Sequence, residues 1–147
     1  MTTLPIALQI EMFLRVIFAC FLGGLIGWER ERHGITTAGI RTYGAIALGS
    51  CSFGLIAFYI APVNPSQMTA QIISGIGFLG GGIIFRQGDY VTGLTTAATL
   101  WATSAVGLAV AFGMYMNAVL VSALLFLLLY LPRLQWWKKV SRKSFEV

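Results

Sequence analysis

Apolar residues run along this chain in long stretches that are separated by short polar segments. A helix needs about 20 apolar residues to cross a hydrocarbon core of roughly 30 Å, with a usable range of about 17–25. Five stretches satisfy this requirement, and they cover residues 4–27, 42–60, 65–85, 94–113 and 115–131. The pattern therefore predicts an all-α fold, a bundle of five transmembrane helices in one domain over residues 1–132.

Composition supports a polytopic membrane protein. Hydrophobic residues make up 57% of the chain and charged residues 10%, with a mean hydropathy of +0.81, whereas about a quarter of a soluble domain is charged. No basic segment precedes the first apolar stretch, and Glu29 and Arg30 follow it in place of a small-residue cleavage site. We therefore expect the first span to stay in the mature protein.

The basic residues predict the orientation. With five spans, nearly all of them fall on one side of the membrane: Arg30, Arg32, Arg41, Arg86, Arg133, Lys138, Lys139, Arg142 and Lys143. Arg15, inside the first span, is the exception. Positively charged connections stay in the cytoplasm, so the amino terminus is expected outside and residues 133–147 form a basic cytoplasmic tail. The net charge of +5 then reflects orientation and contact with anionic lipid, and nucleic-acid binding is not predicted.

The start of the third span has the pattern of a capped helix. Asn64 suits the N-cap, Pro65 the first helical position, and Gln67 the reciprocal position of a capping box. Free amide groups at a helix end near lipid have few other partners, which favours this structural interpretation. The alternative is an outward-facing ligand site made of Asn64, Ser66, Gln67 and Gln71.

Glycines within the spans predict close helix packing. The segment Gly75–Gly80 matches the dinucleotide-binding pattern of three glycines, but it lies inside an apolar span and lacks the required strand and turn. Pairs of small residues four positions apart instead allow helix backbones to approach closely. We expect such glycines to pack against another helix or against a second subunit, namely Gly23, Gly27, Gly75, Gly77, Gly81 and Gly107.

Polar side chains within the fourth span form a predicted ridge of small, partly hydroxylated residues. The ridge contains Thr95, Thr96, Thr99 and Thr103, and Gly107 and Ala111 continue it. In the first span, Glu11 and Arg15 are four residues apart and can pair along the helix surface. Cys20 and Cys51 lie in separate spans without metal-ligand spacing, so we interpret them as small apolar residues.

The first connection carries the densest charge. Glu29, Glu31 and Arg41 are interpreted either as interfacial salt bridges, each worth about 0–1 kcal/mol, or as a cluster at the inner mouth of the bundle. In the second interpretation Glu29 or Glu31 pairs with Arg41. The cluster then gates the inner mouth of the bundle, or binds a cation or a partner there. Glu29 and Glu31 are the weak candidates for metal binding. The spans contain neither a Ser-His-Asp set nor paired carboxylates at depth, so neither an enzyme nor a cofactor is predicted.

Several long motifs occur in an order that resembles the MgtC/SapB family of bacterial inner-membrane proteins. They are Gly23–Arg32, Gly39–Thr42, Gln71–Gly82 and Gly93–Gly107. The resemblance implies a five-span bundle in the bacterial plasma membrane. It also implies a role in adaptation to low magnesium or acid, including survival of some pathogens inside macrophages.

The chain departs from the family pattern at three places. Many relatives have Asp and Arg where this chain has Asn64 and Gln67, and many have Asn where it has Thr95. About fifteen residues follow Pro132, so the cytoplasmic carboxyl-terminal domain of some members is expected to be absent. Functions that depend on that domain or on the aspartate are not expected to transfer.

Two functions compete. The first is a non-enzymatic regulator that contacts itself or another membrane protein; the resemblance implies inhibition of the proton-driven ATP synthase, and close-packing ridges favour a symmetric homodimer. The second is a transporter of magnesium or another cation. Magnesium is usually held by carboxylates and retained waters, yet no Asp or Glu lies in the middle of a span. A path would be lined by the fourth-span threonines, with Glu29 and Glu31 at its inner end.

Overall fold

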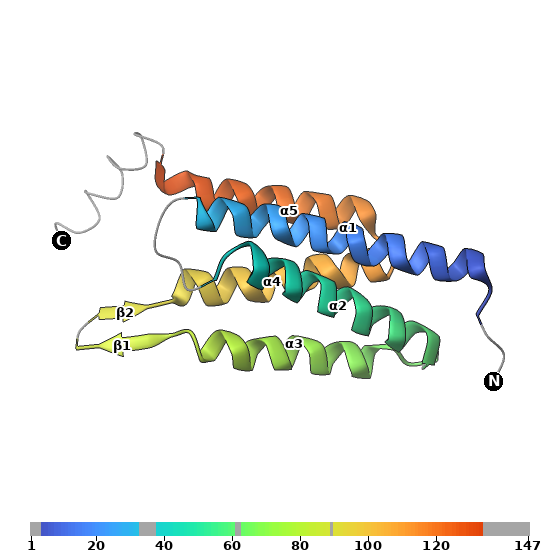
Figure 1. The fold of residues 1–147 in the computed structure, drawn as a ribbon. Coiled ribbons are helices and arrows are strands. Elements are labelled where there is room, and N and C mark those ends of the chain that lie inside the picture. Colours follow the sequence, from blue (N-terminus) through green and yellow to red (C-terminus); the bar gives the residue numbers. More distant parts are fainter. Residues whose placement is uncertain (1–3, 33–37, 61–62, 89, 134–147) are drawn as a thin grey trace.

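The computed structural model describes residues 4–32, 38–60, 63–88 and 90–133. These residues form five α-helices, one β-hairpin and a final 3-10 turn (Figure 1). The elements are α1 (Ile6–Glu31), α2 (Ile40–Ile60), α3 (Ser66–Gly81), β1 (Phe85–Gln87), β2 (Tyr90–Thr92), α4 (Leu94–Ala111), α5 (Tyr115–Tyr130) and η1 (Leu131–Arg133). Successive helices run in opposite directions, so α1 begins at one end of the bundle and α5 finishes at the other.

Helices occur at all five predicted spans. Among the described residues, α1, α2 and α4 are long and apolar enough to cross a membrane, and α5 is a shorter apolar helix of 16 residues. α3 also has 16 residues. The helical membrane-protein class expected from the sequence is therefore present.

The third predicted span is partly wrong, because the helix ends at Gly81 rather than continuing to Phe85. Consecutive glycines at 80–82 weaken a helix, since glycine loses the most backbone freedom on folding. The chain then forms an antiparallel hairpin that pairs Phe85 with Thr92 and Gln87 with Tyr90. The strictly all-α expectation is corrected by this hairpin, which extends beyond one end of the bundle (Figure 1). We call this end the hairpin end.

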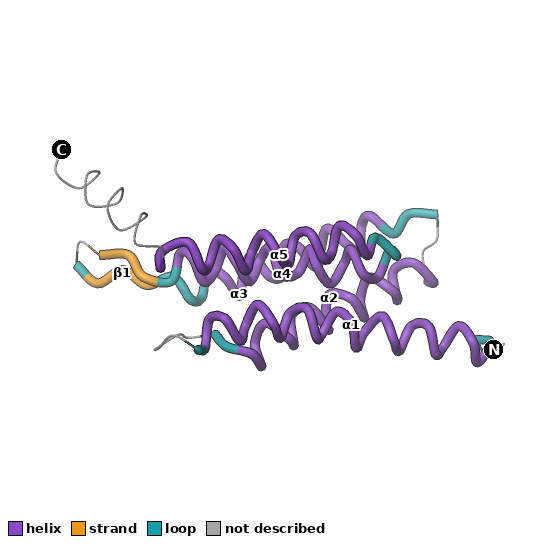
Figure 2. Tube along the Cα trace, turned by 90° about the horizontal axis from the view of Figure 1, so that it is seen from above, coloured by secondary structure: helices purple, strands orange, loops and turns teal. Residues whose placement is uncertain are grey.

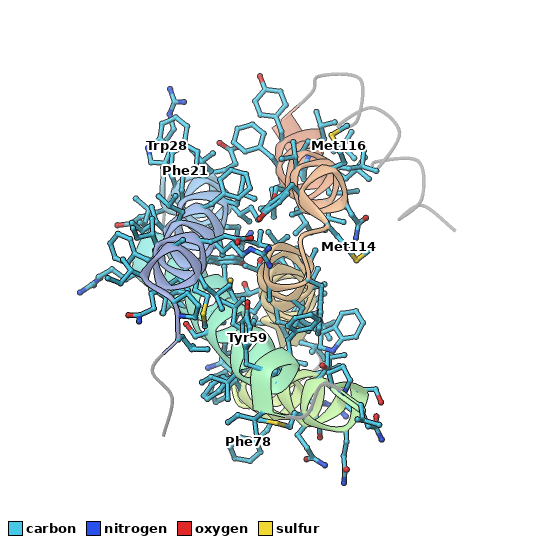
Figure 3. All side chains as sticks on the ribbon, turned by 90° about the vertical axis from the view of Figure 1, so that its right-hand side faces the viewer. Phe21, Trp28, Tyr59, Phe78, Met114 and Met116 are labelled. Carbon is cyan, nitrogen blue, oxygen red and sulfur yellow. The ribbon has the colours of Figure 1, made fainter. Side chains whose placement is uncertain are left out.

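α4 is the central helix of the bundle. It contacts α1, α2, α3 and α5, and the view along the bundle shows the other helices arranged around it (Figure 3). The view from above shows α4 and α5 close together, with α1 on the other side of the bundle (Figure 2). The largest fully buried apolar side chains come from α1, α2 and α4: Ile26, Tyr43, Leu100, Val106 and Val110.

Three glycines bring α1, α2 and α4 close together. A Cβ added at Gly23 would lie 2.6 Å from the Cβ of Ala47, and one added at Gly27 would lie 2.7 Å from the Cα of Ile40. A Cβ at Gly107 of α4 would lie 2.9 Å from the Cβ of Ser50. No residue larger than glycine fits at these three contacts without moving its neighbours.

The glycines of α3 behave differently. A Cβ at Gly75, Gly77 or Gly81 would meet nothing within 4 Å. Their expected packing against another helix is therefore not found within the described chain, and the second-subunit alternative remains. Gly80 is the one buried residue of α3, all of which is described.

Candidate functional site

A buried polar cluster lies at the hairpin end, where α1, α2 and α4 meet. Its members are Arg30, Tyr43, Thr96 and Thr99, and we call it the hairpin-end cluster. The Arg30 guanidinium donates from Nη2 to Thr96 Oγ1 at 2.6 Å, and the Tyr43 hydroxyl lies 2.6 Å from Thr99 Oγ1. Glu29 is only 2% exposed and lies in the last turns of α1. Hydrogen bonds of this cluster thus join α1 and α2 to α4.

The threonines of α4 present one buried face rather than a complete ridge. Thr96, Thr99 and Thr103 are buried, whereas Thr95 is exposed and differs from the expected placement. Residues four apart shift by about 40° around a helix at each step, so Thr95 does not share the face of Thr103. The Thr103 hydroxyl donates to the Thr99 carbonyl at 2.7 Å. The hydroxyls therefore bond within the protein and provide the contacts to Arg30 and Tyr43.

Glu31 and Arg41 do not form the expected charged pair at this end. Glu31 Oε2 accepts a hydrogen bond from the backbone N–H of Ile40 at 3.0 Å, which satisfies a free amide at the start of α2. Arg41 is exposed. Of the three predicted cluster residues, only Glu29 is buried in the bundle. Within the described residues, no group of three His, Cys, Asp or Glu side chains is placed to hold a metal ion.

A second arginine of α1 contacts α4 at the other end of α4. Arg15 forms the salt bridge with Glu11 that the four-residue spacing predicts. Its Nη1 also donates to the backbone carbonyl of Ala111, the last residue of α4, at 2.7 Å. A free carbonyl at a helix end is thereby satisfied.

The start of α3 differs from the predicted capping box. No side chain makes a capping hydrogen bond there. The Asn64 side-chain oxygen accepts from the Ser66 hydroxyl instead, and Gln67 is exposed. Pro65 has helical dihedral angles and its carbonyl accepts from the Thr69 N–H at 3.2 Å, so it lies at the helix start.

A large groove separates α2 from α3. Its volume is about 1460 Å³, and its walls are mainly apolar side chains and glycines of these two helices, with Leu100 of α4 also lining it. Ser50 of α2 lines the groove as well. The Ser50 side chain is 2% exposed, and its hydroxyl has no hydrogen-bond partner within the described part of the chain.

Sequence reasoning missed Arg30, Tyr43 and Ser50. Arg30 follows Gly23 and Gly27 at seven and three residues, so all three share a helix face. That spacing could have placed Arg30 against another helix rather than in the connection. For Tyr43 and Ser50, which stand within an apolar span, the sequence has no comparable signal.

The bundle, in which three of the described helices are long and apolar enough to cross a membrane, has the character of a helical membrane protein. Residues 16–135 match the MgtC family. This match covers most of the chain, and the chain belongs to the MgtC family.

Relatives of this chain carry the same family name. The chain is 42% identical over 112 residues to "Protein MgtC" of Salmonella typhimurium, which covers 76% of this chain and 48% of the relative. It is 45% identical over 106 residues to "Protein MgtC" of Brucella abortus, which covers 71% of this chain and 44% of the relative. The chain thus spans about half the length of these relatives. No solved structure shows significant similarity.

Proposed function

We propose that this protein is a non-enzymatic regulator of the bacterial inner membrane that acts through contacts with other membrane proteins. In this proposal the chain crosses the membrane five times, with its amino terminus outside. The basic residues support this orientation, because Arg30, Arg32, Arg41 and Arg86 all lie near the hairpin end. Such a bias marks the cytoplasmic side.

The observation that carries the proposal is the exposure of α3. One of its sixteen residues is buried, although it contains Gln67, Gln71 and Ser74, which are exposed. Polar side chains in a membrane usually face protein or a water-filled cavity rather than lipid. A helix of this composition that its own chain leaves uncovered is suited to contact another protein.

The polar contacts at the hairpin end support a structural role for the most polar part of the protein. Arg30 bonds to Thr96, and Glu31 bonds to the backbone of α2. These bonds fix the helices against each other, which leaves α3 as the surface for regulation. In this proposal the regulation serves adaptation to low magnesium, to acid or to the host phagosome, and its target is the ATP synthase; the match to the MgtC family supports this assignment.

The test measures proton-driven ATP synthesis in inverted inner-membrane vesicles with and without this protein at equal amounts. We expect the protein to lower the rate of synthesis. Gly75→Leu fills open space beside α3 and should remove the effect, whereas Gly24→Leu on α1, where a Cβ also meets nothing within 4 Å, should keep it. Equal rates with and without the wild-type protein would contradict the ATP synthase as target, and equal activity of the two variants would contradict the role of α3.

Cation transport is the second candidate, favoured by one observation. Buried Glu29 precedes Arg30, whose side chain bonds to Thr96 at the start of the buried threonine face of α4, so polar groups extend from the hairpin end along α4. A transporter should carry magnesium into proteoliposomes, and Glu29→Gln should reduce that flux by at least about tenfold. Glu31→Gln, which alters the α2 cap, is the matched control. Flux equal to that of protein-free liposomes would exclude this candidate.

A further inference from the structure

The groove between α2 and α3 has the size and walls of a helix-docking site. Its volume of about 1460 Å³ exceeds the roughly 300–1,000 Å³ of small-molecule pockets. Both walls carry glycines with open space at the Cβ position, Gly49 on α2 and Gly75 and Gly81 on α3. Such positions allow the backbone of another helix to approach closely.

Ser50 gives the groove wall a polar side chain deep in the membrane. Its buried hydroxyl lacks a hydrogen-bond partner among the described residues. Ser50 is ten residues from each end of α2 (Ile40–Ile60), or about 15 Å at 1.5 Å per residue. That distance places it near the middle of a hydrocarbon core of roughly 30 Å. A lipid presents only acyl chain at this depth, whereas a helix can present a polar side chain.

α3 itself carries a polar and a large apolar side chain that match the walls of the groove. Ser74 is exposed and lies eight residues after Ser66, about 12 Å from the start of the helix. α2 ends and α3 starts at the same end of the bundle (Figure 1), so Ser74 and Ser50 lie at similar depths. Phe78 is 84% exposed and projects away from the other helices (Figure 3). α3 thus offers both a hydroxyl and a large apolar side chain to a partner groove.

We propose that the groove holds α3 of a second copy of this chain, in a dimer with a two-fold axis along the membrane normal. The inference rests on the proposed regulatory function and names its first partner. Each copy supplies both the groove and the inserted helix, so the contact is isologous and closes after two copies. Both copies have the same orientation, which keeps equivalent residues at equal depth and brings Ser74 of one copy near Ser50 of the other.

The contact is tested by photo-crosslinking in liposomes. Protein with p-benzoylphenylalanine in place of Phe78 is mixed from light and isotopically heavy preparations, reconstituted and irradiated. We expect light–heavy peptide pairs that join position 78 to α2 or α3 of the other copy. The control carries the same group in place of Leu120, a 58% exposed residue of α5, and should give at least about tenfold fewer pairs.

Dimer affinity in the same lipid provides the second measurement. Gly75→Leu should weaken the dimer by about tenfold or more, and Gly24→Leu should leave it unchanged. Ser50→Ala, which retains the apolar groove, should weaken it by about threefold, as expected for one hydrogen bond between membrane helices. Circular dichroism melts identify any variant that fails to fold.

The following outcomes would overturn the proposed dimer. Lipid adducts alone, or peptide pairs within one copy alone, would show that no second copy enters the groove. Crosslinks in native membranes to a different protein alone would also overturn it, yet they would leave the proposed regulatory function standing. Loss of that function is read separately, in the ATP synthesis assay.

Discussion

At the scale of the residue, single glycines determine how closely the central helices approach. Gly23 and Gly107 leave no room for a Cβ, whereas the neighbouring Gly24 leaves open space. The same residue type therefore has opposite effects at adjacent positions. The spacing of Gly23 and Gly27 predicts close packing from the sequence alone, because small residues four apart share a helix face.

Gly23→Ala should lower the free energy of unfolding by about 1–3 kcal/mol, because the new methyl would lie 2.6 Å from both the Ala47 Cβ and the Tyr43 carbonyl oxygen. Gly24→Ala should leave stability unchanged or raise it by up to about 1 kcal/mol, since alanine favours the helix. Unfolding titrations with dodecyl sulfate in mixed micelles measure both. Similar losses for the two variants would contradict the packing described for α1 and α2.

The polar contacts between helices were less accessible to sequence reasoning than the glycines. The pairing of Glu11 with Arg15 could be predicted because both residues stand on one helix. The bonds from Arg30 to Thr96 and from Glu31 to Ile40 join different helices. Their formation depends on how the helices are rotated against each other, which a single sequence does not specify.

At the scale of the element, the five helices followed from hydrophobic length, but the end of α3 did not. Apolar residues continue through Ile83, Ile84 and Phe85, so length alone extends the helix. The hairpin depends instead on backbone geometry at two glycines. Gly88 has a φ of +62° and Gly93 a φ of +88°, values that residues with a side chain rarely adopt.

Asparagine substitutions at these two positions distinguish the cost of a positive φ from the cost of steric crowding around a new Cβ. Asparagine tolerates a positive φ better than most residues, and a Cβ at Gly88 meets nothing within 4 Å. A Cβ at Gly93 would lie 2.9 Å from the carbonyl carbon of Ile83. Gly88→Asn should therefore cost less than about 1 kcal/mol and Gly93→Asn about 2–3 kcal/mol of unfolding free energy. Equal costs in the same titration would refute the tight contact at Gly93.

At the scale of the whole molecule, the positions of the basic residues predict the orientation, while the surface open to a partner could not be predicted. The glycines of α3 were expected to pack, and their spacing resembles that of Gly23 and Gly27. Only the structure shows that Gly23 and Gly27 face the start of α2 and its neighbouring turn, whereas Gly75, Gly77 and Gly81 face open space. Spacing reveals a surface fit for packing, but it does not identify the helix that covers it.

Labelling of single cysteines tests the orientation of the whole chain. In a background with Cys20→Ala and Cys51→Ala, Val63→Cys lies in the connection between α2 and α3, where Val63 is 98% exposed. Gln87→Cys lies in the exposed hairpin. A membrane-impermeant maleimide should label position 63 in intact cells and position 87 only after permeabilisation. The reverse pattern would show that the hairpin end faces outward.

The two arginines of α1 restrict how the molecule can move. Arg15 bonds to the last carbonyl of α4, and Arg30 bonds to Thr96 near its first turn. Fifteen residues, about 22 Å of helix, separate them. A slide of α1 along α4 by one turn, about 5.4 Å, would break both bonds together. We therefore expect α1 and α4 to keep their register, and a movement between helices to involve α3, whose register no buried side-chain bond holds among the described residues.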